Sequence, residues 1–117
     1  MTWSVTFHDA FEPEFVALPL PVREAILSAA RVLREFGPEL GRPYADTLNG
    51  SRHANMKELR MKAGGGVWRI AFAFDPSRRA ILLVAGDKAG ISQGLFYRRL
   101  IDIADRRFDA HLLTRLH

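Results

Sequence analysis

The sequence predicts one α+β domain, in which a small and mainly antiparallel sheet carries a helical hairpin near the N-terminus and a long helix near the C-terminus. Three observations support this fold class. A central stretch, residues 57–85, repeats apolar side chains with the two-residue period of strands, whereas the flanking segments repeat them with the period of helices. The 117 residues suffice for one hydrophobic core and are too few for two ordinary domains. Hydrophobic residues make up 48% and charged residues 26%, as in ordinary globular proteins. We expect residues 1–117 to form a single domain with the order β-α-α-β-β-β-α.

The N-terminal third is expected to form a strand and then two helices. Residues 3–7 alternate apolar and polar side chains, which predicts a half-buried first strand. Asp9 is a plausible N-cap for a first helix, whose apolar residues recur at helical spacing: Phe11, Phe15 and Leu18. A second helix is predicted from Val22, because apolar residues follow the i, i+4, i+7 pattern until Gly37-Pro38 ends it.

The second half is expected to supply the rest of the sheet and the closing helix. Residues 37–55 show little periodicity and are predicted to form a long connection. Strands are then predicted at 57–61 and 67–74, joined by a glycine-rich hairpin tip. Residues 80–85 are apolar enough for a strand that is covered on both faces. Residues 94–116 place an apolar side chain at every fourth position, which predicts the closing helix.

Positive charge is concentrated in one part of the chain. Lys and Arg total 17 against 13 Asp and Glu, 14 of the 17 are arginine, and residues 51–99 hold ten basic and three acidic residues. Such a surface attracts phosphates or acidic protein segments, which leaves lipid, nucleic acid and an acidic protein partner open. The absence of cysteine excludes disulfides, thiolate metal sites and cysteine nucleophiles. Because no secretory signal and no run of about 18 apolar residues occur, we expect a cytoplasmic protein that does not enter a membrane.

Strand alternation predicts which charged side chains share a face of the sheet. In the strand at 67–74 one face is apolar and forms the core: Trp68, Ile70, Phe72 and Phe74. Arg69 then points to the opposite face, where the small side chains of Ala71 and Ala73 leave room. The same rule places Glu58 and Arg60 beside Arg69, on a face expected to be open. Lys88, directly after the next strand, can lean over it.

This group combines one carboxylate with three cations, an arrangement suited to binding a phosphodiester and stabilising added negative charge on it. The alternative is a set of solvated cross-strand ion pairs, each contributing only ~0–1 kcal/mol to stability. The residues alone leave both interpretations open. No clustered metal ligands occur at recognisable spacing, so we expect neither a metal nor another cofactor.

Three features, in this order and spacing, resemble a known protein family. They are the triplet Glu58-Leu59-Arg60, the triplet Trp68-Arg69-Ile70, and Lys88 following the apolar strand. Together they resemble the RelE/ParE superfamily of bacterial toxins, and within it the phage-derived, Gp49-like branch that includes HigB-like proteins. The resemblance implies a RelE-like fold and a toxin of a type II toxin–antitoxin pair. It also implies an mRNA endonuclease that works in the ribosomal A site without a metal, through attack of the 2′-hydroxyl on the adjacent phosphate.

The resemblance also implies roles for individual residues. Arg69 would bind the scissile phosphate and stabilise the pentacoordinate state, while Arg60 and Lys88 would add positive charge. Glu58 would orient or deprotonate the 2′-hydroxyl. Relatives supply a proton donor near the C-terminus, and here it would be Tyr97 or His111.

Further residues are candidates for contacting RNA. The segment Tyr97-Arg98-Arg99 places an aromatic ring next to two arginines, which suits stacking of a base and binding of a phosphate. His53 lies in the segment that leads into the Glu58 strand, and Lys57 directly precedes Glu58. Each of these can equally be an ordinary loop or surface residue.

Two functions other than mRNA cleavage remain open, and all three functions involve an antitoxin as a partner. One is non-enzymatic inhibition of DNA gyrase in the manner of ParE. The other is an inactive regulatory module that binds only its antitoxin. The resemblance implies a cognate antitoxin, expected to be a helix-turn-helix protein encoded next to the toxin and covering the basic region. The other expected partners are mRNA and the ribosome, with operator DNA bound only through the antitoxin complex.

Overall fold

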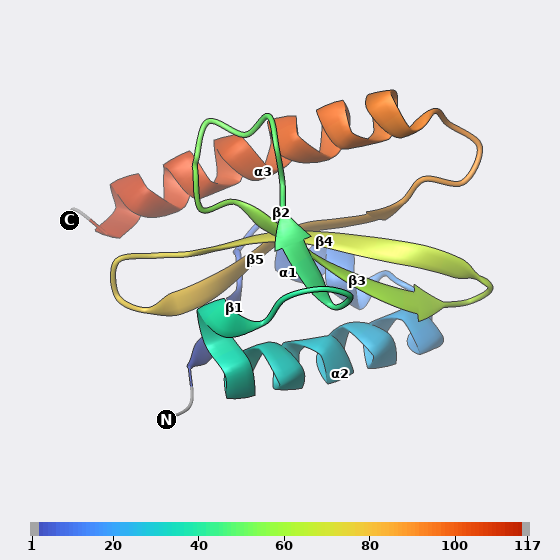
Figure 1. Ribbon diagram of the computed structural model, residues 1–117, viewed down its shortest axis with the longest axis horizontal. Helices are drawn as coiled ribbons and strands as arrows, with labels where there is room; N and C mark the ends of the chain where they lie inside the picture. Colours follow the sequence, from blue (N-terminus) through green and yellow to red (C-terminus); the bar gives the residue numbers. More distant parts are fainter. Residues whose placement is uncertain (1–2, 116–117) are drawn as a thin grey trace.

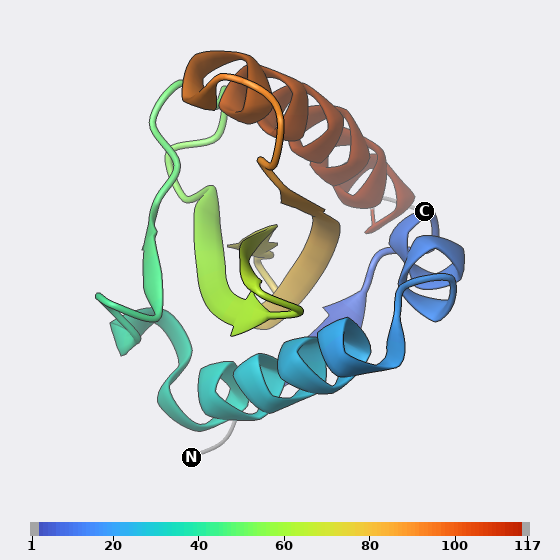
Figure 2. The same ribbon diagram turned by 90° about the vertical axis from the view of Figure 1, so that its right-hand side faces the viewer.

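The computed structural model describes residues 3–115 and has the expected α+β fold, with one five-stranded sheet between helices (Figures 1 and 2). The strands are β1 (Ser4–Phe7), β2 (Ala45–Thr47), β3 (Lys57–Ala63), β4 (Gly66–Phe74) and β5 (Arg79–Asp87). The helices are α1 (Phe11–Val16), α2 (Leu20–Phe36), the 3-10 turn η1 (Gly37–Glu39) and α3 (Gln93–Arg115). The strand order is β1-β5-β4-β3-β2, and β1 and β5 form the parallel pair in a sheet whose other pairs are antiparallel.

The N-terminal strand and helical hairpin are confirmed, with two corrections. Asp9 is not the cap of α1, because the capping position is Ala10, whose own side chain makes no capping hydrogen bond. The backbone carbonyl of His8 instead accepts hydrogen bonds from the first turn of α1, and His8 Nδ1 accepts one from Ala10. The second helix begins at Leu20 rather than Val22, since a proline is tolerated in a first turn.

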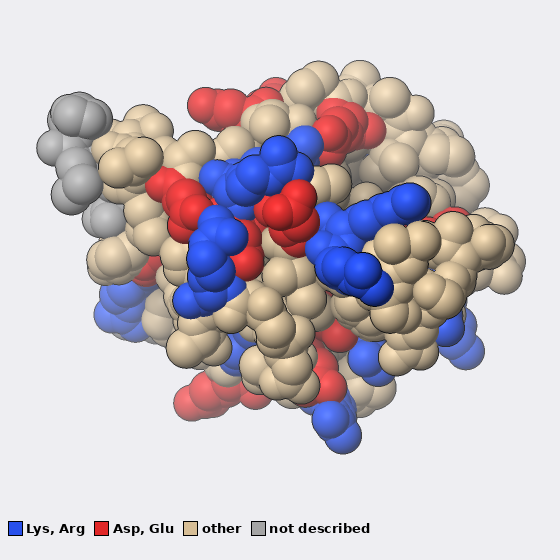
Figure 3. Space-filling view, turned by 90° about the horizontal axis from the view of Figure 1, so that it is seen from above, with Lys and Arg blue, Asp and Glu red and all other residues tan. Residues whose placement is uncertain are grey.

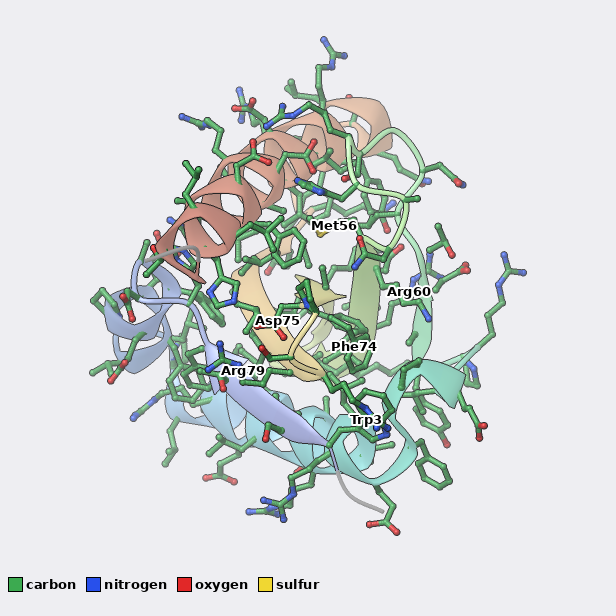
Figure 4. The ribbon with its side chains drawn as sticks, turned by 90° about the vertical axis from the view of Figure 1, so that its left-hand side faces the viewer. Trp3, Met56, Arg60, Phe74, Asp75 and Arg79 are labelled. Atoms are coloured by element: carbon green, nitrogen blue, oxygen red, sulfur yellow. The ribbon has the colours of Figure 1, made fainter. Side chains whose placement is uncertain are left out.

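Gly37 ends α2 as predicted, and the structure shows why only glycine fits there. Its φ is 59°, a left-handed conformation that residues with a Cβ rarely adopt. The indole of Trp3 also lies directly against it, so that a Cβ at this position would be 2.3 Å from Trp3 Nε1. Trp3 in turn contacts Phe74 edge to face, with ring centroids 5.3 Å apart (Figure 4). Trp3 therefore packs between the end of α2 and the end of β4.

The long connection at 37–55 contains a strand that periodicity did not predict. Strand β2 pairs with β3, with Ala45 opposite Leu59 and Thr47 opposite Lys57. Three residues are too few to display a repeat, and β2 is defined by its pairing partner rather than by its own pattern. The rest of the connection returns to the sheet at Met56, which is fully buried.

The predicted alternation in the sheet is confirmed on the side that faces α1 and α2. Leu59, Ile70 and Phe72 are buried there against Ile26 and Leu33 of α2. Strand β5 is covered on both faces as expected, with Ala80 to Val84 all buried. Ala80 and Leu82 join the first of two hydrophobic layers, and Ile81, Leu83 and Val84 belong to the second.

The opposite face of the sheet is not open, which corrects the expectation for that face. Helix α3 lies across it, as Figure 2 shows, and a second hydrophobic layer fills the space between them. Ala71 and Ala73 contribute to this layer together with Ala104 and Phe108 of α3. The small side chains of β4 therefore accommodate the helix, because an amphipathic helix must bury its apolar stripe against another element.

Candidate active site

The charged group predicted on β3 and β4 does come together, at the place where α3 begins. Arg60 lies directly opposite Arg69 in the antiparallel pair, and Glu58 lies opposite Ala71. Gly86 of β5 is the neighbour of Arg69 on the other side. The ring of Phe96 lies over Gly86, and a Cβ there would be only 3.1 Å from that ring. The lack of a side chain at Gly86 therefore lets the start of α3 approach the sheet and bring Tyr97 to Arg69.

Hydrogen bonds link four side chains into a chain. Nε of Arg69 donates to Oη of Tyr97 at 2.7 Å, and Oη of Tyr97 donates to Oε1 of Glu58 at 2.8 Å. Nη2 of Arg60 donates to Oε2 of Glu58 at 3.3 Å. Nε of Arg69 also lies 3.8 Å from Oε1 of Glu58. Both carboxylate oxygens of Glu58 are thus engaged.

The charged side chains of this group differ in how deeply they are buried. Glu58 is 3% exposed, so its charge depends on the two guanidinium groups and the phenol beside it. The Arg69 side chain is 11% exposed, whereas the Arg60 side chain is 44% exposed. The contact between Arg60 and Glu58 is therefore the one most accessible to a bound ligand.

Protonation states follow from the same contacts. Burial raises the pKa of Tyr97, and the hydrogen bond to Glu58 and its negative charge raise it further, with Arg69 acting in the opposite direction. The hydrogen bond to Glu58 and its charge also raise the pKa of Arg60. At neutral pH Tyr97 is a neutral hydroxyl that holds its proton, and Arg60 is a cation.

The guanidinium of Arg69 keeps one free edge. Its Cζ lies 5.6 Å from the ring centroids of both Phe96 and Tyr97, which fixes the plane of the group. Nη1 donates to the carbonyl of Val67 at 3.3 Å. Nη2 has no hydrogen-bond partner among residues 3–115, and no described side-chain nitrogen is both buried and unpaired, so this atom reaches solvent. A phosphate oxygen could bind there.

Lys88 lies close to this group in the backbone. It follows β5 by one residue, two positions beyond Gly86, and it is partly buried. Its ammonium makes no hydrogen bond or ion pair with any described residue. Lys88 is therefore a cation without an ionic partner among the described residues, and its backbone lies near the site.

The two histidines do not join the group. Nε2 of His53 lies 2.7 Å from Oδ1 of Asp109, and Nε2 of His111 lies 2.9 Å from Oδ2 of Asp75. Asp109 and His111 are 12 and 14 positions beyond Tyr97 on α3, which places them about 18 and 21 Å along the helix from Tyr97. Of the two proton donors considered from sequence, only Tyr97 contacts Glu58.

The remaining candidates for RNA contact are divided between the two sides of the sheet. Lys57 precedes Glu58 and so points to the opposite face, where its Nζ donates to the carbonyl of Pro38 at 3.2 Å. Arg98 and Arg99 are exposed on α3. Arg98 and Tyr97 line a shallow hollow of about 440 Å³ that extends toward Asn49.

A polar anchor that sequence reasoning missed holds the loop before β3. Asp105 of α3 is 3% exposed and accepts hydrogen bonds from the Ser51 hydroxyl and the Arg52 backbone. Arg52 also pairs with Asp109, and in the view onto α3 basic and acidic side chains alternate along this face (Figure 3). A buried acidic residue within the apolar stripe of a helix is the signal that could have revealed this anchor.

Two further properties concern the described residues as a whole. Residues 3–115 contain no group of three or more histidine, aspartate or glutamate side chains arranged to hold a metal ion. In the same range, no helix has both the length and the apolar character needed to cross a bilayer.

Comparison with known proteins places the chain in a family. Residues 13–109 match the family described as phage derived protein Gp49-like (DUF891). A Mycobacterium tuberculosis (strain ATCC 25618 / H37Rv) protein named "Putative toxin HigB2" is 51% identical over 90 residues, which cover 76% of this chain and 44% of that protein. A second protein of the same strain, named "Putative toxin HigB3", is 48% identical over 100 residues, covering 86% and 85%. The chain thus spans less than half the length of the first relative and most of the second.

A solved structure supports the fold. A mutant of the E. coli toxin RelE in the free state matches with a TM-score of 0.59 and 14% sequence identity, over 87% of this chain and 96% of that chain. At that identity the match concerns the fold alone. From the family match and the two relatives, the chain belongs to the phage-derived Gp49-like family and is homologous to HigB-type toxins of toxin–antitoxin systems.

Proposed function

We propose that this protein is the toxin of a type II toxin–antitoxin system and cleaves mRNA on the ribosome. The observation that carries the proposal is the chain of hydrogen bonds Arg69–Tyr97–Glu58–Arg60, which sets a proton donor and two guanidinium groups around one buried carboxylate. The homology to HigB-type toxins supports the toxin assignment.

Phosphate binding is assigned to the arginines. The free Nη2 edge of Arg69 receives a phosphate oxygen, and the neighbouring rings keep the guanidinium in position. Arg60 is exposed enough to leave Glu58 and bind a second oxygen, and Lys88 adds positive charge. Fixed cations of this kind stabilise the extra negative charge of a pentacoordinate phosphate.

The proton transfers can be assigned to Glu58 and Tyr97. When Arg60 moves to the phosphate, Oε2 of Glu58 becomes free and accepts the proton of the 2′-hydroxyl, while the 2′ oxygen forms a bond to phosphorus. The bond from phosphorus to the 5′ oxygen breaks, and Tyr97 gives its proton to that oxygen. Arg69 stabilises the tyrosinate through the Nε contact, and the starting state returns when Oε2 of Glu58 releases its proton to water and the Tyr97 oxygen takes a proton from water. The products are a 2′,3′-cyclic phosphate and a 5′-hydroxyl.

The test is mapping of 5′ ends of cellular mRNA after brief induction of the protein. We expect new 5′-hydroxyl ends within translated codons for the wild type, and a loss of cleavage by roughly 100-fold or more for Arg69→Ala, since removal of one transition-state donor has this effect in other enzymes. Arg31→Ala is the matched control, because Arg31 is an exposed arginine on α2. Circular dichroism verifies that each variant is folded.

The same experiment separates the other two functions. A gyrase inhibitor would induce a DNA-damage response without mRNA cuts, and would tolerate Arg69→Ala. An inactive module would cause neither effect and would not arrest growth. Unchanged cleavage by folded Arg69→Ala protein would contradict the proposed mechanism.

A further inference from the structure

An open groove runs along the sheet on the side away from α3, between α2 and the β3–β4 hairpin. Its volume is about 550 Å³. The floor is aliphatic and is built from Ala25, Ala29 and Val32 of α2 with Met61 and Val67 of the hairpin. Val67 is 37% exposed, so part of this apolar floor is in contact with solvent.

The rim of the groove is basic. Arg60 and Lys62 line it, next to the exposed ring of Tyr44, and none of the described residues that line it is acidic. Lys62 is exposed and makes no hydrogen bond or ion pair with residues 3–115. An aliphatic floor below the unpaired Lys62 and the half-exposed Arg60, whose carboxylate partner Glu58 is not part of the groove, complements a peptide segment that carries both apolar and acidic side chains.

The groove and the candidate active site share Arg60. The Arg60 guanidinium donates to Glu58, and the same side chain lines the groove. In Figure 4 Arg60 stands at the side of the sheet, between the level of α2 and the level of α3. A carboxylate bound in the groove would therefore compete with Glu58, and with the RNA phosphate, for this arginine.

We propose that the groove binds an acidic, amphipathic segment of the antitoxin, whose carboxylates pair with Arg60 and Lys62 and whose apolar side chains cover the floor. The inference rests on the proposed function, because it takes the partner to be the antitoxin of this toxin. Binding there inhibits cleavage by withdrawing Arg60 from the site, without filling the space beside Tyr97. RNA is the less suitable occupant, since the floor is aliphatic and, among the described residues that line the groove, Tyr44 alone offers a ring on which a base could stack.

Two substitutions in the groove test this proposal outside the catalytic group. Lys62→Glu reverses a rim charge, and Ser28→Trp places a large side chain in the groove from an exposed position of α2. The matched controls are Arg31→Glu and Leu27→Trp, which make the same kinds of change in the other groove of α2, beside β1. The probe is the full-length protein encoded by the neighbouring gene, and its dissociation constant is measured by calorimetry with the complete toxin chain.

We expect each groove variant to weaken the partner's binding by about 10-fold or more, and each control to change it by less than about 3-fold. In cells, Lys62→Glu protein should cleave mRNA like the wild type and should continue to do so when the partner is co-expressed. Unchanged partner affinity in both groove variants would overturn the proposal. It would also be overturned if these variants lost ribosome binding instead, because the groove would then hold RNA. Because the partner's affinity is measured without RNA, the binding result can be interpreted even if the proposed nuclease activity is not found.

Discussion

The phenol of Tyr97 donates a hydrogen bond of 2.8 Å to Oε1 of Glu58, and so joins the first turns of α3 to strand β3 across 39 positions of sequence. The same phenol oxygen accepts a hydrogen bond from Arg69. Tyr97 is thus the residue through which the helix and two strands meet at the candidate site. Its contribution can be measured by removing a single oxygen atom.

Tyr97→Phe should lower mRNA cleavage by about 100-fold or more, because a positioned proton donor contributes a factor of this size. The ring remains, so stability should fall by only about 1–2 kcal/mol for the lost hydrogen bonds. The measurements are cleavage of ribosome-bound mRNA and urea unfolding. Tyr44→Phe is the control, since Tyr44 is 57% exposed and, in the described part of the chain, its hydroxyl makes no hydrogen bond to Glu58 or Arg69. Full activity of Tyr97→Phe would exclude Tyr97 as the proton donor.

Glu58→Ala should destabilise the fold as well as inactivate the site. Removing the buried carboxylate leaves Arg69, whose side chain is 11% exposed, without its anionic partner. Breaking a buried ion pair costs about 3–5 kcal/mol, and we expect about 2–3 kcal/mol here because Arg60 can return to water. Urea unfolding measures the change. Glu35→Ala, at an exposed position of α2, should change stability by less than about 0.5 kcal/mol.

The sequence predicted the strands of this site better than the helix that completes it. Side-chain alternation in β4 predicts that Arg69 points to one face of the sheet and the buried Ile70 and Phe72 to the other. This is correct, because successive side chains of a strand point to alternate faces. The apolar side chains of β3 and of β4 must both face the core. Glu58 and Arg60 are therefore predicted on the same face as Arg69 without knowledge of how the two strands pair. These relations depend only on neighbours within one hairpin.

The position of α3 could not be predicted in this way. Periodicity identifies the apolar stripe of a helix, yet it does not say which sheet face the stripe covers, so the sequence predicts that Ala71 and Ala73 border open space. The residues alone indicate Tyr97 as a ring for stacking bases, and the family resemblance indicates Tyr97 or His111 as the proton donor. Neither places the Tyr97 phenol in a hydrogen-bond chain with Glu58, where the structure has it. His53 is near Glu58 in sequence, which suggests that it lies near the site, but in the structure its ring contacts Asp109 in the far part of α3.

A second buried carboxylate should make the stability depend on pH. The Asp75 side chain is fully buried and burial by itself raises its pKa, but the hydrogen bond from His111, those from the backbone of Arg79 and Ser77, and the charge of Arg79 outweigh burial and lower the pKa below the ordinary value. A carboxyl whose pKa is lowered by folding adds stability above its unfolded pKa, about 3.9, and loses it as the pH falls through the folded value.

Asp75→Asn should therefore lower the urea midpoint at pH 7, and the difference from the wild type should shrink as the pH falls below about 4. The measurement is urea unfolding at several pH values between neutral and about 2.5. Asp9→Asn removes the same charge at an exposed position and should leave the pH dependence nearly unchanged. A gap between Asp75→Asn and the wild type that stays constant down to the lowest pH would show that the lost stability does not come from the ionised carboxylate.

Gly37→Ala should be among the most damaging single-atom additions to this chain. The new Cβ would lie 2.3 Å from Trp3 Nε1 and would also occupy a left-handed backbone conformation, with φ at 59°. Relief of the overlap requires the Trp3 indole to leave its contact with Phe74, so the end of α2 and the end of β4 should loosen together. We expect a loss of about 2–4 kcal/mol in the free energy of unfolding. Gly41→Ala is the control, because nothing lies within 4 Å of a Cβ at Gly41, and it should change stability by less than about 0.5 kcal/mol. Equal stability of the two variants would mean that Trp3 moves aside at no cost, and that the contact of Trp3 with Gly37 does not fix the end of α2.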